Sequence, residues 1–140
     1  MVQRWGAPTV VAHGRAYAAA ELPGFVALAD DEPRGVVTYS IEGHACEIVT
    51  IDSVTEGMGI GTALIEAVAN RARETACRRL WLITTNDNLP MLRFAQKRGF
   101  ALVAVHPNAL ETSRKLKPEI PRVGHDGILL RDELELERLL

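Results

Sequence analysis

The stretch that decides the fold is Glu56-Gly57-Met58-Gly59-Ile60-Gly61-Thr62, which joins a predicted strand to a predicted helix. Its glycines carry no Cβ atom, so the backbone can adopt positive φ and approach a ligand closely. The helix that begins at Ile60 has N–H groups without intrahelical partners in its first turn, where the positive end of its dipole also lies. The sequence therefore predicts an anion site, and a phosphorylated ligand is its expected occupant.

Strands are predicted on the N-terminal side of this loop. Residues 25–29, 36–41 and 46–51 are rich in apolar and β-branched side chains, and polar turns with proline or glycine separate them. Consecutive strands joined by tight turns pair antiparallel, so these three predict a meander. Residues 9–12 are predicted to form a further short strand.

On the other side of the loop the apolar periodicity changes from two to about 3.6 residues, which predicts an amphipathic helix over residues 60–76. Residues 80–84 are almost continuously apolar, as in a strand buried on both faces. A strand, a helix and a second strand in this order predict a parallel βαβ unit.

A second helix is predicted over residues 89–98, with Asn88 as its N-cap and Gly99 as its terminator, and a strand follows over residues 100–105. Residues 106–128 are predicted to be irregular because prolines and glycines interrupt them.

The last ten residues alternate leucine with glutamate, which indicates an edge strand over residues 131–140 with a solvated glutamate face; a short helix is the alternative. The fold class predicted from all these elements is α/β. It has a mixed, mostly antiparallel sheet, a central βαβ unit and flanking helices, in a single domain over residues 1–140.

The composition excludes several function classes. A formal net charge of −2 with 24% charged residues favours neither nucleic acid nor an anionic membrane as a partner. No apolar run reaches the roughly 18 residues that span a bilayer, and the N-terminus lacks a signal-peptide core. Cys46 and Cys77 match no metal spacing and are expected to remain reduced thiols. A cytoplasmic protein without a metal is the expectation.

From Glu47 to Phe100 the chain resembles the core of the GNAT superfamily, the acetyl-CoA-dependent N-acetyltransferases. The resemblance rests on the glycine loop opening a helix after a strand, and on later residues at the family's spacing, namely Asn88, Phe94 and Lys97-Arg98-Gly99-Phe100. It implies a GNAT-like fold, acetyl-CoA as cosubstrate, and direct transfer of the acetyl group to a primary amine of a small molecule or peptide. The region before residue 25 is shorter than in the family, so a homodimer that covers the acceptor site is a further expectation.

In this superfamily the CoA pyrophosphate binds backbone N–H groups of the glycine loop, and the pantetheine arm lies between two parallel strands like an added strand. An asparagine at the start of the later helix commonly holds the cofactor. Carried over to this chain, the implied cofactor-binding residues are Ser53, Val54, Gly57, Met58, Gly59, Ile60, Gly61, Thr62 and Asn88.

Glu47 is the implied catalytic base. Its position is similar to that of the strand glutamate that serves as base in the histone-acetylating branch, and the acceptor amine must be neutral to attack. The alternative interpretation is a strand glutamate that faces solvent. The N–H of Val54 is a candidate donor to the thioester carbonyl.

Two departures from the family pattern support a second hypothesis, a non-catalytic acyl-CoA-binding module. Glu56 stands where the family usually has glutamine or arginine, and a carboxylate beside a phosphate weakens binding. Ala95 stands where many members have a tyrosine that protonates the CoA thiolate. A dinucleotide-binding fragment is a third hypothesis, although the glycine spacing differs from the G-x-G-x-x-G pattern.

The region predicted to be irregular contains further polar residues of interest. Arg114, Lys115, Lys117 and Arg122 form a basic cluster, interpreted mainly as a solvated loop. His106 and His125 are candidate substrate contacts, with surface histidines as the more ordinary interpretation.

Overall fold

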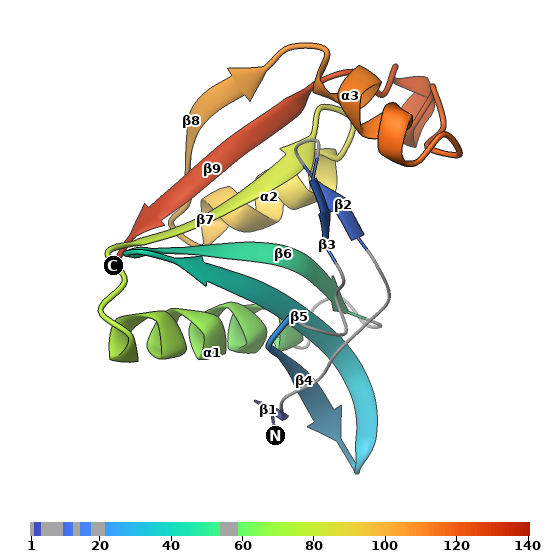
Figure 1. Ribbon diagram of the computed structural model, residues 1–140. Coiled ribbons are helices and arrows are strands. Elements are labelled where there is room, and N and C mark those ends of the chain that lie inside the picture. Colours follow the sequence, from blue (N-terminus) through green and yellow to red (C-terminus); the bar gives the residue numbers. More distant parts are fainter. Residues whose placement is uncertain (1, 4–9, 13–14, 18–21, 54–58) are drawn as a thin grey trace. The chain divides into compact units, whose positions relative to one another are not determined.

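A computed structural model describes residues 2–3, 10–12, 15–17, 22–53 and 59–140 (Figure 1). The chain forms two compact units. The first comprises Met1–Val10, Ala18–Leu80 and Leu139–Leu140, and the second comprises Val11–Tyr17 and Trp81–Arg138. The fold is mixed α/β with mostly antiparallel strands, as predicted.

An antiparallel meander forms the sheet of the first unit. Strands β4 (Gly24–Ala29), β5 (Glu32–Glu42) and β6 (Ala45–Ser53) pair in chain order, and the short β1 (Val2–Gln3) pairs with β4. The predicted meander is therefore confirmed. β5 starts earlier than predicted, and a register shift in its pairing with β4 accommodates Pro33, which has no N–H to donate to a ladder.

Helix α1 (Ile60–Glu74) packs against β4, β5 and β6 and supplies the core of this unit (Figure 1). Its buried residues are Leu64, Ile65, Val68, Ala69 and Ala72. Leu64, Val68 and Ala72 lie on the stripe that the 3.6-residue periodicity predicts to be apolar and buried, whereas Ala63 lies on the same stripe and is exposed. The helix ends before Ala76, because that residue adopts a φ of 61°.

Three strands form the sheet of the second unit, in the order β7-β9-β8. They are β7 (Arg79–Thr85), β8 (Ala101–His106) and β9 (Glu133–Leu139), and β8 pairs antiparallel with β9. The prediction of an edge strand at the C-terminus is wrong, because β9 lies between its two neighbours. Its glutamate face is not simply solvated either, since Glu133 is only 4% exposed.

The remaining elements are the helices of the second unit and a small hairpin. Helix α2 (Leu89–Lys97) follows β7 as predicted, and Gly99 terminates it with a φ of 89°. Helix α3 (Ala109–Leu116) lies in the region predicted to be irregular, so that prediction is wrong for these eight residues. The prolines at 107 and 118 flank this helix and do not interrupt it.

A 3₁₀ turn, η2 (His125–Gly127), precedes β9, and β2 (Val10–Ala12) and β3 (Arg15–Tyr17) form a separate two-stranded sheet. None of the helices in the described ranges is both long enough and apolar enough to cross a membrane.

Candidate functional site

The predicted phosphate loop is described from Gly59 onward, at the start of α1. Val54, Gly57 and Met58 lie outside the described residues, and so does Glu56. Gly59 is the N-cap of α1 with a φ of 72° and a ψ of 7°, a left-handed conformation that favours glycine. A Cβ atom added there would meet no heavy atom of the described residues within 4 Å.

The N-terminal end of α1 has the character of an anion site. Gly59 offers no capping side chain, and the first turn contains no acidic residue. The N–H of Ala63 donates to the carbonyl of Gly59 (2.9 Å) and begins the intrahelical hydrogen bonds. The positive end of the helix dipole at Ile60, Gly61 and Thr62 is therefore not neutralised by a side chain of the helix itself.

Gly35 on β5 brings the end of β6 and the start of α1 together. It pairs with Ser53, and a Cβ atom on Gly35 would lie 2.8 Å from Cγ2 of Ile60 and 2.9 Å from the carbonyl oxygen of Asp52. Two of the predicted cofactor-binding residues, Ser53 and Ile60, are thus neighbours of one glycine. Sequence analysis placed Gly35 in a turn; a glycine beside a β-branched run is the signal for such a close backbone approach.

Ser53 is the last residue of β6, and its N–H already donates to the Asp52 carboxylate (2.9 Å). A pantetheine arm beside this strand would therefore meet a Ser53 N–H that is already in use.

Glu47 lies in the middle of β6, opposite Ser40 of β5, and is 4% exposed. The alternative of a solvent-facing glutamate is therefore wrong. The neighbouring Cys46 is fully buried, and burial, with Cys77 and Glu47 contributing, raises the pKa of its thiol to about 12. Cys46 is consequently a protonated thiol at neutral pH.

Asn88 belongs to the second unit, where it caps α2 as predicted. Its Oδ1 accepts a hydrogen bond from the N–H of Met91 (3.2 Å), and Pro90 fits in the first turn, where its missing N–H costs nothing. The cap uses only the oxygen of the amide, so the NH₂ group is not part of it. Glu47, Ser53 and Gly59 belong to the first unit.

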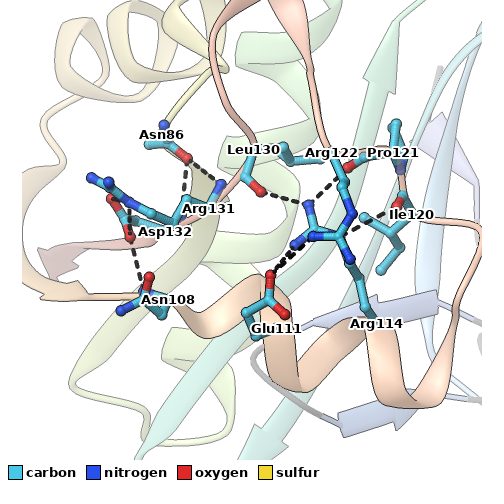
Figure 2. A network of polar contacts seen from close by, with 10 residues as sticks. All are labelled: Asn86, Asn108, Glu111, Arg114, Ile120, Pro121, Arg122, Leu130, Arg131 and Asp132. Carbon is cyan, nitrogen blue, oxygen red and sulfur yellow. Dashed lines mark hydrogen bonds and ion pairs between the residues drawn. The ribbon is translucent and has the colours of Figure 1, made fainter.

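Asn86, which the sequence analysis did not single out, fastens the start of β9 to the end of β7 (Figure 2). Its Nδ2 donates to the carbonyl of Leu129 (2.8 Å), and its Oδ1 accepts from the N–H groups of Arg131 (3.1 Å) and Asp132 (3.0 Å). Its own N–H donates to the carbonyl of Asp132 (3.0 Å). One asparagine thereby satisfies four backbone groups of a segment more than forty residues away.

Asp87, also missed, fastens the 3₁₀ turn. It is 3% exposed and accepts hydrogen bonds from the hydroxyl of Thr85, from the N–H of His125 (2.9 Å) and from Nδ1 of His125 (3.0 Å). Burial acts to raise the pKa of this carboxyl, but the hydrogen bonds from Thr85 and His125 outweigh it and lower the pKa. A Cβ atom on Gly124 would lie 2.0 Å from Oδ2 of Asp87, so this contact requires glycine.

Arg114 of α3 fastens the residues between α3 and β9, and it corrects the interpretation of the basic cluster as a solvated loop. Its side chain is 10% exposed and donates to the carbonyls of Pro121 (2.9 Å) and Leu130 (2.6 Å) (Figure 2). It also pairs with Glu111 (2.9 Å). Arg122, by contrast, is 76% exposed, as the interpretation expected.

These contacts define a feature that we call the anchored segment, residues 117–131. Asn86 and Asp87 hold it to the carboxyl end of β7, and Arg114 holds it to α3. The same β7 end continues directly into Asn88, the predicted cofactor contact. The polar run Asn86-Asp87-Asn88, immediately after a buried strand, is the sequence signal that could have indicated the contacts of the anchored segment.

Residues 4–100 match the family model described as the acetyltransferase (GNAT) family. The chain belongs to the GNAT family. Two curated relatives of this GNAT protein are YdhI and YxbD of Bacillus subtilis (strain 168), both described as uncharacterized. They are 45% and 46% identical to it over 139 residues, which is 99% of this chain and 87% of each relative.

Solved GNAT-like structures share the fold. The IAA acetyltransferase of Bacillus cereus ATCC 14579 has a TM-score of 0.74 at 22% identity, covering 87% of this chain and 80% of that one. A Bacillus subtilis acetyltransferase in complex with CoA has a TM-score of 0.72 at 24% identity, covering 85% and 77%. A GNAT family acetyltransferase of Elizabethkingia anophelis with acetyl-CoA bound has a TM-score of 0.72 at 23% identity, covering 85% and 76%.

Within residues 2–3, 10–12, 15–17, 22–53 and 59–140, no three His, Cys, Asp or Glu side chains are grouped to hold a metal ion.

Proposed function

We propose that this GNAT protein transfers an acetyl group from acetyl-CoA directly to a primary amine of a small molecule or peptide. The observation that carries the proposal is the start of α1, where the N-cap Gly59 offers no capping side chain and the first turn of the helix contains no acidic residue, as at an anion site. Family membership and the CoA and acetyl-CoA complexes of two neighbours support the choice of this anion.

The proposed cofactor-binding residues are the strand end at Ser53 and Val54, the loop residues Gly57 and Met58, the helix start from Gly59 to Thr62, and Asn88. Acetyl-CoA, when bound, would supply an activated thioester. The protein's own task is then to hold the pyrophosphate with backbone N–H groups and to keep the acceptor amine neutral.

Glu47 is the proposed proton acceptor. Its carboxylate lies in the protein interior at 4% exposure, on the strand that ends at Ser53. A carboxylate removed from bulk water can accept a proton from the acceptor amine, directly or through one water molecule.

A non-catalytic acyl-CoA-binding module remains the second candidate, because Ala95 replaces the usual tyrosine. Ala95 is 1% exposed, and its methyl side chain has no proton to donate. Thiols are acidic enough, with a pKa of about 8.5, for CoA to leave as a thiolate without a general acid. The replacement thus lowers the expected rate of transfer but still leaves transfer chemically feasible.

The first test is calorimetric titration with acetyl-CoA, CoA and NAD in parallel. We expect saturable binding of both CoA species and none of NAD. Gly59→Glu should abolish the binding, because its side chain would place a charge and bulk where the pyrophosphate lies. Gly43→Glu is a matched control, since Gly43 has a φ of 59° and no atom within 4 Å of its Cβ position but lies in the turn between β5 and β6.

Failure of wild type to bind either CoA species would overturn the proposal, as would micromolar affinity retained by Gly59→Glu. A screen of small-molecule and peptide amines with acetyl-CoA then separates the two candidates. Turnover of an amine supports the transferase, and tight binding without turnover across the panel supports the binding module.

A further inference from the structure

Asp87 and His125 form a carboxylate–imidazole pair that lies outside the residues proposed to bind the cofactor or to accept the proton of the amine. Asp87 is 3% exposed, and its Oδ2 accepts hydrogen bonds from Nδ1 of His125 (3.0 Å) and from the N–H of the same residue (2.9 Å). The hydroxyl of Thr85 donates to Oδ1. The buried carboxylate therefore holds the ring and the backbone of His125 together.

The carboxylate also determines which ring nitrogen of His125 exchanges a proton. Burial acts to raise the pKa of Asp87, but the hydrogen bonds from Thr85 and His125 lower it, so Asp87 is ionised at neutral pH. An ionised carboxylate only accepts hydrogen bonds, and Nδ1 of His125 must therefore donate. The ring keeps its Nδ1 proton in both charge states, and Nε2 is the atom that gains or loses a proton.

The imidazole of His125 is accessible although its partner is buried. Its side chain is 64% exposed, and the contact of Nδ1 with Asp87 leaves Nε2 on another side of the ring. The turn that carries it is closed by hydrogen bonds from the Gly124 N–H to the Ile128 carbonyl (2.8 Å) and from the Ile128 N–H to the His125 carbonyl (3.0 Å). The ring is thus held in place before any ligand arrives.

We propose that His125 donates, from Nε2, the proton that the sulfur of CoA takes up as the acetyl group leaves it. The inference rests on the proposed acetyl transfer. Asp87 directly precedes Asn88, a proposed cofactor-binding residue, and both belong with His125 to the second unit. Ala95 of the same unit has no proton to donate where many family members have a tyrosine. A proton donor beside Asn88 would supply what that alanine lacks.

Bonds and protons balance in this step. The acceptor nitrogen bonds to the acetyl carbon as the carbon–sulfur bond breaks, and the electron pair of that bond goes to the sulfur. His125 gives its Nε2 proton to the sulfur, while the proton of the amine goes to the proposed acceptor, Glu47. His125 then takes a proton from solvent, to which its side chain is exposed. Asp87 acts only through His125 and is a positioning residue.

Nitrogen-15 NMR of the histidine side chains tests the pair without any cosubstrate, and His125→Gln identifies the signal by its loss. In the wild type the neutral His125 ring should carry its proton on Nδ1. Asp87→Ala should move this proton to Nε2, because the acceptor at Nδ1 is gone. A neutral wild-type ring protonated at Nε2 would overturn the proposal, whether or not Asp87→Ala folds. An Nδ1 proton retained in folded Asp87→Ala would overturn the positioning role.

Steady-state kinetics over a pH series tests the proton transfer itself. His125→Gln should lower kcat by about 10- to 100-fold, at or below the usual contribution of a general acid, because CoA can also leave as a thiolate. The basic limb of the pH–rate profile, which an acid that must be protonated produces, should disappear. The calorimetric affinity for acetyl-CoA should stay at the wild-type value, which also shows that the variant is folded.

His44→Gln is the matched control. His44 is also exposed, and its Nδ1 also contacts an acceptor, the carbonyl of Ala76 (3.1 Å), but it lies in the turn between β5 and β6. This variant should keep the wild-type kcat and pH–rate profile. A basic limb that His125→Gln leaves unchanged would overturn this inference alone. A wild type that binds no CoA species or acetylates no amine would overturn the proposed function, and this inference with it.

Discussion

Glu47 is buried and is also the residue proposed to accept a proton from the acceptor amine. A carboxylate at 4% exposure loses much of its hydration, and such a group is stable only with compensating partners. Buried ionisable groups are common at catalytic centres. We therefore expect the base to lie in the interior of β6, on the same strand that ends at Ser53.

Glu47→Gln keeps the shape of the side chain and removes its capacity to accept a proton. We expect kcat to fall by about 100-fold or more, with little change in the affinity for acetyl-CoA, because general-base catalysis contributes factors of this size. The acidic limb of the pH–rate profile should disappear. Steady-state kinetics over a pH series and a parallel titration with acetyl-CoA measure both effects.

Glu32→Gln is the control for this prediction, because Glu32 is an exposed strand residue paired with Arg34 (3.3 Å). It should leave both kinetics and affinity unchanged. A Glu47→Gln enzyme with the wild-type pH–rate profile would show that the base lies elsewhere.

At the scale of elements, the anchored segment depends on side chains outside itself. Arg114 lies on α3, and Asn86 and Asp87 follow β7, yet together they bond the backbone at Pro121, His125 and Leu130, among others. The segment contains few buried apolar residues, so these hydrogen bonds are its main source of order.

Arg114→Ala should release the anchored segment while the rest of the protein stays folded. It removes charge-assisted hydrogen bonds to three main-chain carbonyls, those of Ile120, Pro121 and Leu130, which costs about 2–4 kcal/mol. Arg122→Ala is the matched control, because the Arg122 side chain is 76% exposed and pairs with the exposed Glu111 at 3.5 Å; its effect should stay within about 0.5 kcal/mol.

Amide hydrogen exchange of residues 117–131 and limited proteolysis would detect the release. Equal protection of the segment in wild type and Arg114→Ala would contradict the role assigned to this arginine.

The elements that the sequence predicts correctly are those with a local signal. The meander follows from β-branched runs and turn residues, α1 from its periodicity, and the Asn88 cap from its place before Pro90. Glu47 was identified through a family resemblance, and its burial agrees with a functional position. Its catalytic role stays a prediction.

The missed features depend on contacts between distant residues. Asn86 bonds residues up to 46 positions away, and the position of β9 between β7 and β8 is set by pairing that alternation of leucine and glutamate does not encode. Arg114 was interpreted as part of a solvated cluster because the sequence shows its charge. The sequence does not show which main-chain carbonyls accept its hydrogen bonds. α3 was missed because eight residues between two prolines carry too short a periodic pattern.

At the scale of the whole molecule, acid sensitivity should originate in the second unit. Asp87 has a lowered pKa for the reasons given above, and the hydrogen bond from the Arg131 side chain, together with the Asn108 N–H, lowers the pKa of Asp132. A carboxyl with a lowered folded-state pKa stabilises the fold above its unfolded pKa, which is about 3.9 for aspartate. That contribution is lost as the pH falls through the folded-state pKa.

The thermal unfolding midpoint should therefore be lower at about pH 3 than at about pH 6, on either side of the unfolded pKa of aspartate. Asp87→Asn should be less stable than the wild type at the higher pH and should lose less on acidification. Asp31→Asn, at an exposed turn residue with a φ of 62°, should keep the wild-type pH dependence. Calorimetric scans of the three proteins at both pH values measure these midpoints. An equal fall in the midpoint of wild type and Asp87→Asn between the two pH values would contradict the role assigned to Asp87.

The Arg114 contacts have a consequence for how this protein can diversify. Arg114 recognises main-chain carbonyls of Ile120, Pro121 and Leu130, and every amino acid offers the same carbonyl. The shape of the segment is thus largely uncoupled from the identity of its exposed side chains, such as Val123 and Leu129. Mutational drift, or a randomised library confined to those positions, can change the chemistry of this surface while the backbone keeps its course. The fold thereby provides a variable surface on a constant frame.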